Sequence, residues 1–134
     1  MKYKIFLALL IVAIGTTQCK KDAIYGNTGT IHWQDCLEFF DHDVTICLEN
    51  IEEARCPCYA DCIWEGMVTA TLKVSAPGGE YTIQLSTNSS PDALNHSDTI
   101  ENRVIRFVNT NISVCDDDFG QKEKYKVEVE VTNI

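Results

Sequence analysis

The chain has 134 residues, with 11 lysines and arginines against 20 aspartates and glutamates, and its formal net charge is −9. This length accommodates one domain. Such an acidic surface repels the phosphate backbone of nucleic acid, so we expect no nucleic-acid partner.

The first eighteen residues predict an export signal and not part of the fold. Lys2 and Lys4 form a short positive segment, and residues 5–15 form an uninterrupted apolar run. This run is shorter than the ~20 apolar residues that cross a bilayer. We therefore expect a cleavable signal peptide over 1–18.

The cysteine count favours lipoprotein processing over ordinary signal cleavage near Gly15. The chain has seven cysteines. Acylation of Cys19 leaves an even number, which in an exported chain is typical of a disulfide framework. We expect Cys19 to begin a lipidated tether over 19–29 and to hold the protein in the cell envelope, as an outer-membrane lipoprotein on the periplasmic face or the cell surface. The other cysteines, all expected in disulfides, are Cys36, Cys47, Cys56, Cys58, Cys62 and Cys115.

From residue 30 onward the pattern predicts one strand after another. Apolar and polar residues alternate with a period of two, which is typical of antiparallel sheets with one face in water. The alternating segments are 44–49, 68–74, 81–85, 105–107 and 125–132. We therefore expect residues 30–134 to form one all-β domain, a single antiparallel β-sandwich of about seven strands, immunoglobulin-like and stapled by disulfides.

A cysteine-rich segment carries the most distinctive motif. Residues 55–66 read Arg-Cys-Pro-Cys-Tyr-Ala-Asp-Cys-Ile-Trp-Glu-Gly, and the chain ends in a Tyr-x-Val-x-Val strand that begins at Tyr125. With its Arg-Cys-Pro, its Cys-x-Trp-x-Gly and this final strand, the chain resembles small Bacteroidota-type lipoproteins of unknown function over roughly 40–134. The resemblance implies a fold and a compartment but no reaction. It also implies a disulfide between Cys56 and Cys62.

The remaining four cysteines have three possible pairings. Spacing agrees with the pair that the resemblance implies, because Cys56 and Cys58 are too close to bridge comfortably, while a longer span can meet the ~5.5 Å Cα separation of a disulfide. Cys47 is expected to point outward from its strand, and Cys36 lies just before that strand, which favours joining these two. Cys58 would then pair with Cys115, although the other pairings stay open.

Metal or thiol chemistry is a competing interpretation of the same cysteines. Cys56, Cys58 and Cys62, with a histidine such as His42, offer thiolate and imidazole ligands. Cys56-Pro-Cys58 is also a candidate for thiol redox chemistry. Exported thiols usually oxidise to structural disulfides, so we expect no metal and no cofactor.

The acidic run Asp116-Asp117-Asp118 resembles the beginning of a calcium loop. A full loop requires oxygen ligands at alternate positions followed by glycine, and here Gly120 comes a residue early. Aspartate and glycine often form simple turns. We therefore expect a solvated turn before the final strand.

No catalytic constellation emerges from the sequence, and we expect no enzyme. His32, His42 and His96 are isolated along the chain, and each is expected to be solvated. Trp64 is expected to pack in the core against a disulfide. Trp33 fits a core position or an exposed contact equally well.

The sequence predicts a membrane-anchored, non-catalytic binding or interaction module for an unknown protein or glycan ligand. One alternative is an inhibitor or protective protein whose braced loop 56–62 enters a partner's cleft, since a rigid loop loses little entropy on binding. A second alternative is a metal or thiol-redox protein that uses the cysteine cluster.

Overall fold

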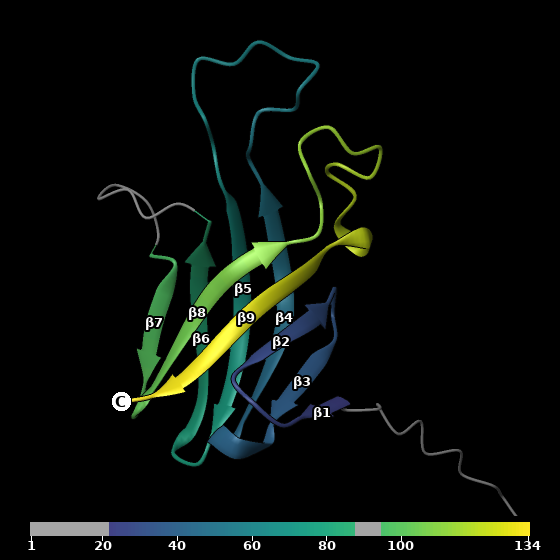
Figure 1. The fold of residues 1–134 in the computed structure, drawn as a ribbon. Helices are drawn as coiled ribbons and strands as arrows, with labels where there is room; N and C mark the ends of the chain where they lie inside the picture. The colour runs from purple at the N-terminus through teal and green to yellow at the C-terminus, as the bar shows by residue number, and fades with distance from the viewer. Residues whose placement is uncertain (1–21, 88–94) are drawn as a thin grey trace, which may run out of the picture.

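The computed structural model describes residues 22–87 and 95–134, which form two β-sheets packed face to face (Figure 1). The all-β prediction is confirmed. The predicted signal peptide over 1–18 and Cys19 lie outside the described residues. Within the described ranges, no helix is long and apolar enough to cross a membrane.

The first sheet has five strands in the order β1-β3-β4-β5-β6. Strands β3 to β6 are antiparallel, while β1 runs parallel to β3. The long strands β4 and β5 pair almost throughout and carry an extended loop at one end (Figure 1). The strands are β1 (Asp22–Ile24), β3 (Cys36–Phe39), β4 (Val44–Glu53), β5 (Val68–Ala76) and β6 (Gly79–Ser86).

The second sheet has four antiparallel strands in the order β2-β9-β8-β7. A register shift between Phe107 and Asn109 marks a bulge in β8 near the point where the chain leaves this sheet. The segment 111–125 that follows includes the short 3₁₀ helix η2 (Lys122–Lys124). The strands are β2 (Thr28–His32), β7 (Ser97–Ile100), β8 (Arg103–Thr110) and β9 (Lys126–Asn133).

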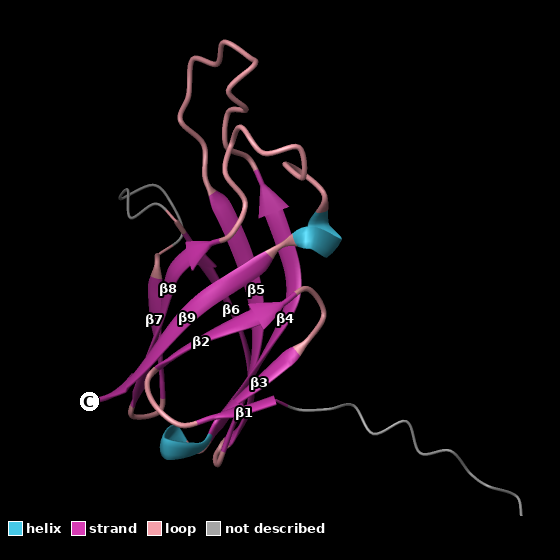
Figure 2. Cartoon of the chain, turned by 45° about the vertical axis from the view of Figure 1, so that its right-hand side comes forward, coloured by secondary structure: helices cyan, strands magenta, loops and turns pink. Residues whose placement is uncertain are grey.

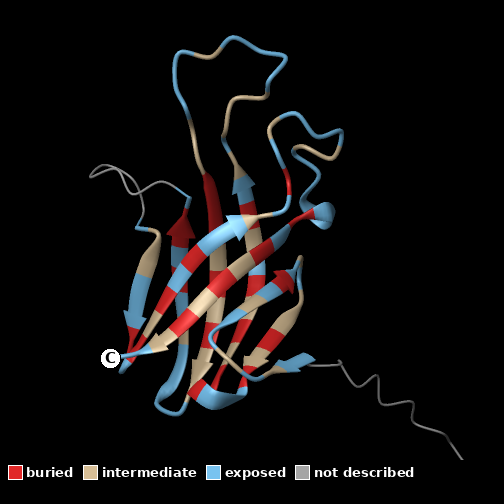
Figure 3. Cartoon of the chain, in the orientation of Figure 1, coloured by how far each residue is buried: buried red, intermediate tan, exposed pale blue. Residues whose placement is uncertain are grey.

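The core lies between the sheets and follows the predicted alternation (Figure 3). On β9, Val127, Val129 and Val131 are fully buried, and the residues between them are half-buried. Tyr125 continues the same buried face. The alternation predicted for β4, β5 and β6 likewise places one face of each strand in the core.

Residues 22–29 of the predicted tether belong to the fold, and the strands outnumber the seven or so that the sequence predicted. The described residues contain nine strands, because the segments 22–24 and 28–32 both join the sheets. Ile31 is buried, and a Cβ on Gly29 would lie 2.3 Å from the Leu37 side chain, so this segment packs closely on the first sheet. Its small and polar residues conceal the pattern, since alternation is visible only where one face is apolar.

Candidate binding surface

Two loops extend from the same end of the sandwich. The segment 54–67, here called the braced loop, connects β4 to β5, and the segment 111–125 connects β8 to β9 (Figure 2). The braced loop begins as a continuation of the hairpin, because the Ala54 N–H donates to the Met67 carbonyl at 2.9 Å and the Cys56 N–H donates to the Glu65 carbonyl at 3.4 Å.

The glycine of the cysteine-rich motif has a steric role in this stem. Gly66 has a φ of +70°, in the left-handed region that other residues rarely adopt. A Cβ at this position would lie 2.0 Å from the Ala54 carbonyl oxygen on the other side of the stem. Only glycine therefore lets the two sides of the stem approach each other this closely.

Three cysteine pairs lie at disulfide distance. One pair closes the braced loop on itself, the second joins it to the segment 111–125, and the third links directly opposed residues of β3 and β4. These are the pairs that the sequence favours. Their Cα separations are 5.9 Å for Cys56–Cys62, 5.2 Å for Cys58–Cys115 and 4.0 Å for Cys36–Cys47.

A backbone hydrogen bond also joins the two loops. The Cys58 N–H donates to the Val114 carbonyl at 3.1 Å. Together with the Cys58–Cys115 pair, it fixes the braced loop to the segment 111–125 at two neighbouring points. The loop is therefore restrained at its stem, within its own span and from its side.

Large apolar side chains on the braced loop remain in water. Tyr59 is 83% exposed, Ile63 is 97% exposed and Trp64 is 63% exposed. The prediction that Trp64 packs in the core is wrong, because β5 begins only at Val68 and the loop rises beyond both sheets. Exposed aromatic and aliphatic residues held on a restrained loop are typical of a contact surface.

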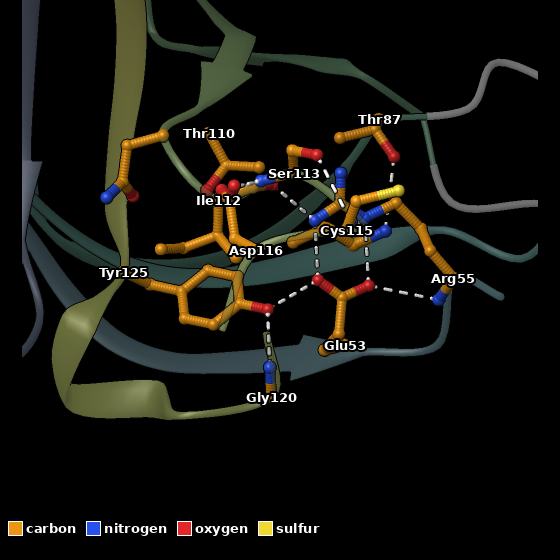
Figure 4. Close-up of polar contacts among 12 residues, drawn as sticks. Glu53, Arg55, Thr87, Thr110, Ile112, Ser113, Cys115, Asp116, Gly120 and Tyr125 are labelled. Carbon is orange, nitrogen blue, oxygen red and sulfur yellow. Dashed lines mark hydrogen bonds and ion pairs between the residues drawn. The ribbon is translucent and has the colours of Figure 1, made fainter. Parts of the chain in front are cut away.

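A buried carboxylate connects the base of the braced loop to the final strand (Figure 4). The Glu53 side chain is 8% exposed and accepts hydrogen bonds from Arg55 Nε at 2.9 Å and Arg55 Nη2 at 2.6 Å. The Tyr125 hydroxyl donates to Glu53 Oε2 at 2.6 Å and accepts from the Gly120 N–H at 3.1 Å. Arg55 also donates to the Ile112 carbonyl at 2.7 Å. These bonds hold both loops to the end of the sheets.

The same network shifts the acid–base equilibria of its members. Burial raises the pKa of Glu53, but the hydrogen bonds from Arg55 and Tyr125 and the Arg55 charge outweigh it, so the pKa lies below its usual range. The bond to Glu53 raises the pKa of Arg55, although burial opposes it. Burial and the bond to Glu53 raise the pKa of Tyr125. At neutral pH the network therefore contains an ion pair and a neutral phenol.

A shallow hollow of about 540 Å³ opens beside the base of the braced loop. Arg55 is the one cation among its lining residues, and its guanidinium is already bound to Glu53 and Ile112. An anionic ligand would have to compete for these bonds, so the hollow is poorly suited to bind one. Its lining residues are Arg55, Cys56, Glu65, Gly66, Thr87 and Val114.

The structure places His42 far from the cysteine cluster. His42 lies in the short 3₁₀ helix η1 (Phe40–His42) at the opposite end of the molecule (Figure 2). It is buried, and its ring nitrogens lie 2.9 Å from Asn27 Oδ1 and 3.1 Å from Asn133 Oδ1. The prediction of a solvated histidine is wrong here, and His42 does not join the cysteines in a metal site. Among the described residues, no group of three His, Cys, Asp or Glu side chains is arranged to hold a metal.

The other candidate residues from the sequence lie in turns, against the core or at the surface. Asp116 and Asp117 are exposed, and Asp116 Oδ2 accepts a hydrogen bond from the Ser113 N–H at 2.6 Å, as in a turn. Trp33 packs against the core, and the Lys122 ammonium lies 5.9 Å from its ring centroid. His32 is exposed.

Comparison of the chain with protein-family models, curated proteins and solved structures finds no match in any of the three. The resemblance to Bacteroidota-type lipoproteins rests on the motif residues alone and stays a prediction.

Proposed function

We propose that this protein is a cell-envelope lipoprotein that acts as a non-catalytic binding module. Its immunoglobulin-like sandwich serves as a rigid base, and its braced loop contacts the partner. The single observation that carries the proposal is the exposure of Tyr59, Ile63 and Trp64 on a loop that two cysteine pairs restrain. Restraint reduces the entropy that a loop loses on binding, which favours affinity.

The chemistry of the exposed side chains supports a protein partner over a glycan. Tyrosine and tryptophan are enriched in protein interfaces and are frequent hot spots there. Ile63 adds an aliphatic side chain that gains stability only when an apolar partner surface covers it. A partner with an apolar recess fits these three side chains together.

The same loop supports a second candidate function, in which the protein inhibits a partner by inserting 56–62 into its cleft. The observation that favours it is the nearly complete exposure of Ile63 beside the closed Cys56–Cys62 span. Saturable inhibition of a co-resident protease, abolished by Ile63→Ser, would distinguish this function from simple binding. The metal and redox alternative has less support, because six cysteines lie in three pairs.

Site-specific photo-cross-linking in native cells tests the proposed contact. A photoreactive residue at Ile63 is expected to give a discrete cross-linked product with one envelope protein. The matched control places the same residue at Thr82, which is exposed on the outer face of β6. Competition with excess purified domain should remove the product, whereas domain carrying Tyr59→Ser and Trp64→Ser should not.

Two results would contradict the proposal. Equal products from positions 63 and 82 would mean that the braced loop is not the contact surface. A product that the doubly substituted domain removes as efficiently as the wild type would mean that the exposed aromatics do not bind the partner.

A further inference from the structure

Large exposed apolar side chains lie at both ends of the β-sandwich. Apart from Val108 on β8 and the three on the braced loop, those that are exposed are Tyr25, Phe40 and Ile134, at 76%, 58% and 81%. The segments that carry these three lie at the end of the sandwich remote from the braced loop (Figures 1 and 2). The molecule therefore has a second apolar end, which the proposed partner contact does not use.

Hydrogen bonds fix Tyr25 and Phe40 next to each other. Their ring centroids are 5.2 Å apart. The residues that follow each of them are also joined, because the Gly26 N–H donates to Asp41 Oδ2 at 2.9 Å and His42 Nε2 lies 2.9 Å from Asn27 Oδ1. The aromatic pair is thus held by the fold and kept in water.

The His42 contacts also place the end of β9 at this site. His42 Nδ1 lies 3.1 Å from Asn133 Oδ1, and Ile134 follows directly. The Asn27 carbonyl accepts from the Val131 N–H at 2.7 Å. The turn between β1 and β2, the η1 helix and the end of β9 are therefore joined by hydrogen bonds next to the aromatic pair.

The chain before β1 indicates what covers this end. Only Lys20 and Lys21 separate Cys19 from Asp22, where β1 begins. Three peptide steps span at most about 11 Å. An acyl chain on Cys19 would therefore keep Asp22 within about 11 Å of the acylated residue, which is one to two times the ~5–8 Å thickness of the head-group layer on each side of a bilayer.

The side chains of the aromatic pair suit that layer. Tyrosine is enriched at membrane–water interfaces, where its ring lies among the head groups and its hydroxyl stays hydrated. The exposed carboxylates nearby, Asp22, Asp41 and Asp43, outnumber the two lysines before β1, and this balance suits a zwitterionic surface better than an anionic one.

From these observations we infer that Tyr25 and Phe40 form a membrane-seating surface. By this we mean a surface that contacts the head groups of the zwitterionic phospholipid layer into which the protein's own lipid anchor is inserted. This inference rests on the proposed lipid anchor at Cys19. It orients the domain, because it turns the braced loop away from the membrane and toward partners beyond it.

Depth-dependent fluorescence quenching of the lipidated full chain tests the inference. The protein is reconstituted in phosphatidylcholine vesicles that carry a spin label at head-group depth. One variant contains Phe40→Trp and Trp64→Phe, and the control contains Tyr59→Trp and Trp64→Phe, so that half-buried Trp33 is the shared reference. The expected result is a blue-shifted emission and a loss of intensity at position 40, with no change at position 59.

Other outcomes overturn the inference in distinguishable ways. Quenching at position 59, or at neither position while the protein stays bound to vesicles, would contradict the seating surface but leave the anchor intact. A blue shift at position 40 that grows with protein density and shows no quenching would assign the surface to a second copy of the chain. An unmodified Cys19 in the membrane-isolated protein, detected by mass spectrometry, would overturn the anchor and the inference together.

Discussion

At the scale of single residues, the molecule depends on groups that periodicity does not reveal. Alternation identifies Val127, Val129 and Tyr125 as one buried face, and the structure confirms it. It does not reveal that the Tyr125 hydroxyl binds Glu53, a residue some seventy positions earlier in the chain. The one sequence signal for this network is Arg55 in the motif, because a half-buried arginine requires an acidic partner.

Replacement of Glu53 with glutamine is expected to destabilise the domain by about 2–4 kcal/mol, because it leaves the Arg55 charge partly buried without its partner. Glu52→Gln is the matched control, since Glu52 is exposed on the same strand and surface substitutions usually change stability by about 0.5 kcal/mol or less. Urea unfolding at neutral pH measures both. Equal effects of the two substitutions would mean that the ion pair contributes nothing.

The lowered pKa of Glu53 also predicts how this difference depends on pH. The folded state holds the proton less tightly than the unfolded state does, so the stabilisation is fully present above about pH 4.3, the ordinary pKa of glutamate. It is lost as the pH falls through the lower pKa of the folded state. The gap in melting temperature between wild type and Glu53→Gln should therefore close at acid pH, and a gap that widens there would contradict the assignment.

At the scale of elements, the long strands were predictable and the short ones were not. The segments 44–49 and 68–74 alternate clearly because each has one face on the core. The segment 22–32 forms two strands because it pairs with β3 and β9. These are tertiary contacts, and the glycines and polar residues of the segment give no sequence pattern that predicts them. The prediction that Trp64 is buried failed for the opposite reason. An apolar residue near a cysteine predicts burial, but here the loop that carries it extends beyond the sheets.

The stem of the braced loop gives a prediction at this scale. Gly66→Ala is expected to lower the free energy of unfolding by at least about 1–3 kcal/mol, because it adds a clash with the Ala54 carbonyl to an unfavourable positive φ. Gly120→Ala is the control, because Gly120 has a φ of +81° but a Cβ there would have no other atom within 4 Å. Thermal unfolding of both variants separates the clash from the backbone strain. The steric role of Gly66 fails if the two substitutions lower the melting temperature equally.

At the scale of the whole molecule, cross-links supplement a core of modest size. Small exported domains commonly rely on disulfides because a short chain buries limited apolar area. The three pairs differ in the length of chain that they close, with sequence separations of 6, 11 and 57 residues. One cross-link lies within the braced loop, one joins the neighbouring strands β3 and β4 of the first sheet, and one joins the braced loop to the segment 111–125.

Loop length predicts which cross-link matters most for stability. In the chain-entropy model, closing the longest span stabilises by about 4 kcal/mol and closing the shortest by about 2 kcal/mol. Cys58→Ser with Cys115→Ser should therefore lower the free energy of unfolding more than Cys56→Ser with Cys62→Ser. The reverse order, measured by denaturant unfolding under oxidising conditions, would mean that the link between the loops is not a restraint on the unfolded chain.

The claim on which the binding module depends is that the six cysteines of the domain are oxidised and restrain the loop that carries Tyr59, Ile63 and Trp64. Mass spectrometry of the unreduced, alkylated protein tests it most directly. The expected result is no alkylated thiol in the domain, with linked peptides joining Cys56 to Cys62, Cys58 to Cys115 and Cys36 to Cys47. Two or more alkylated thiols among Cys56, Cys58 and Cys62, or zinc or copper bound to the purified protein, would contradict the account and favour a metal or redox function.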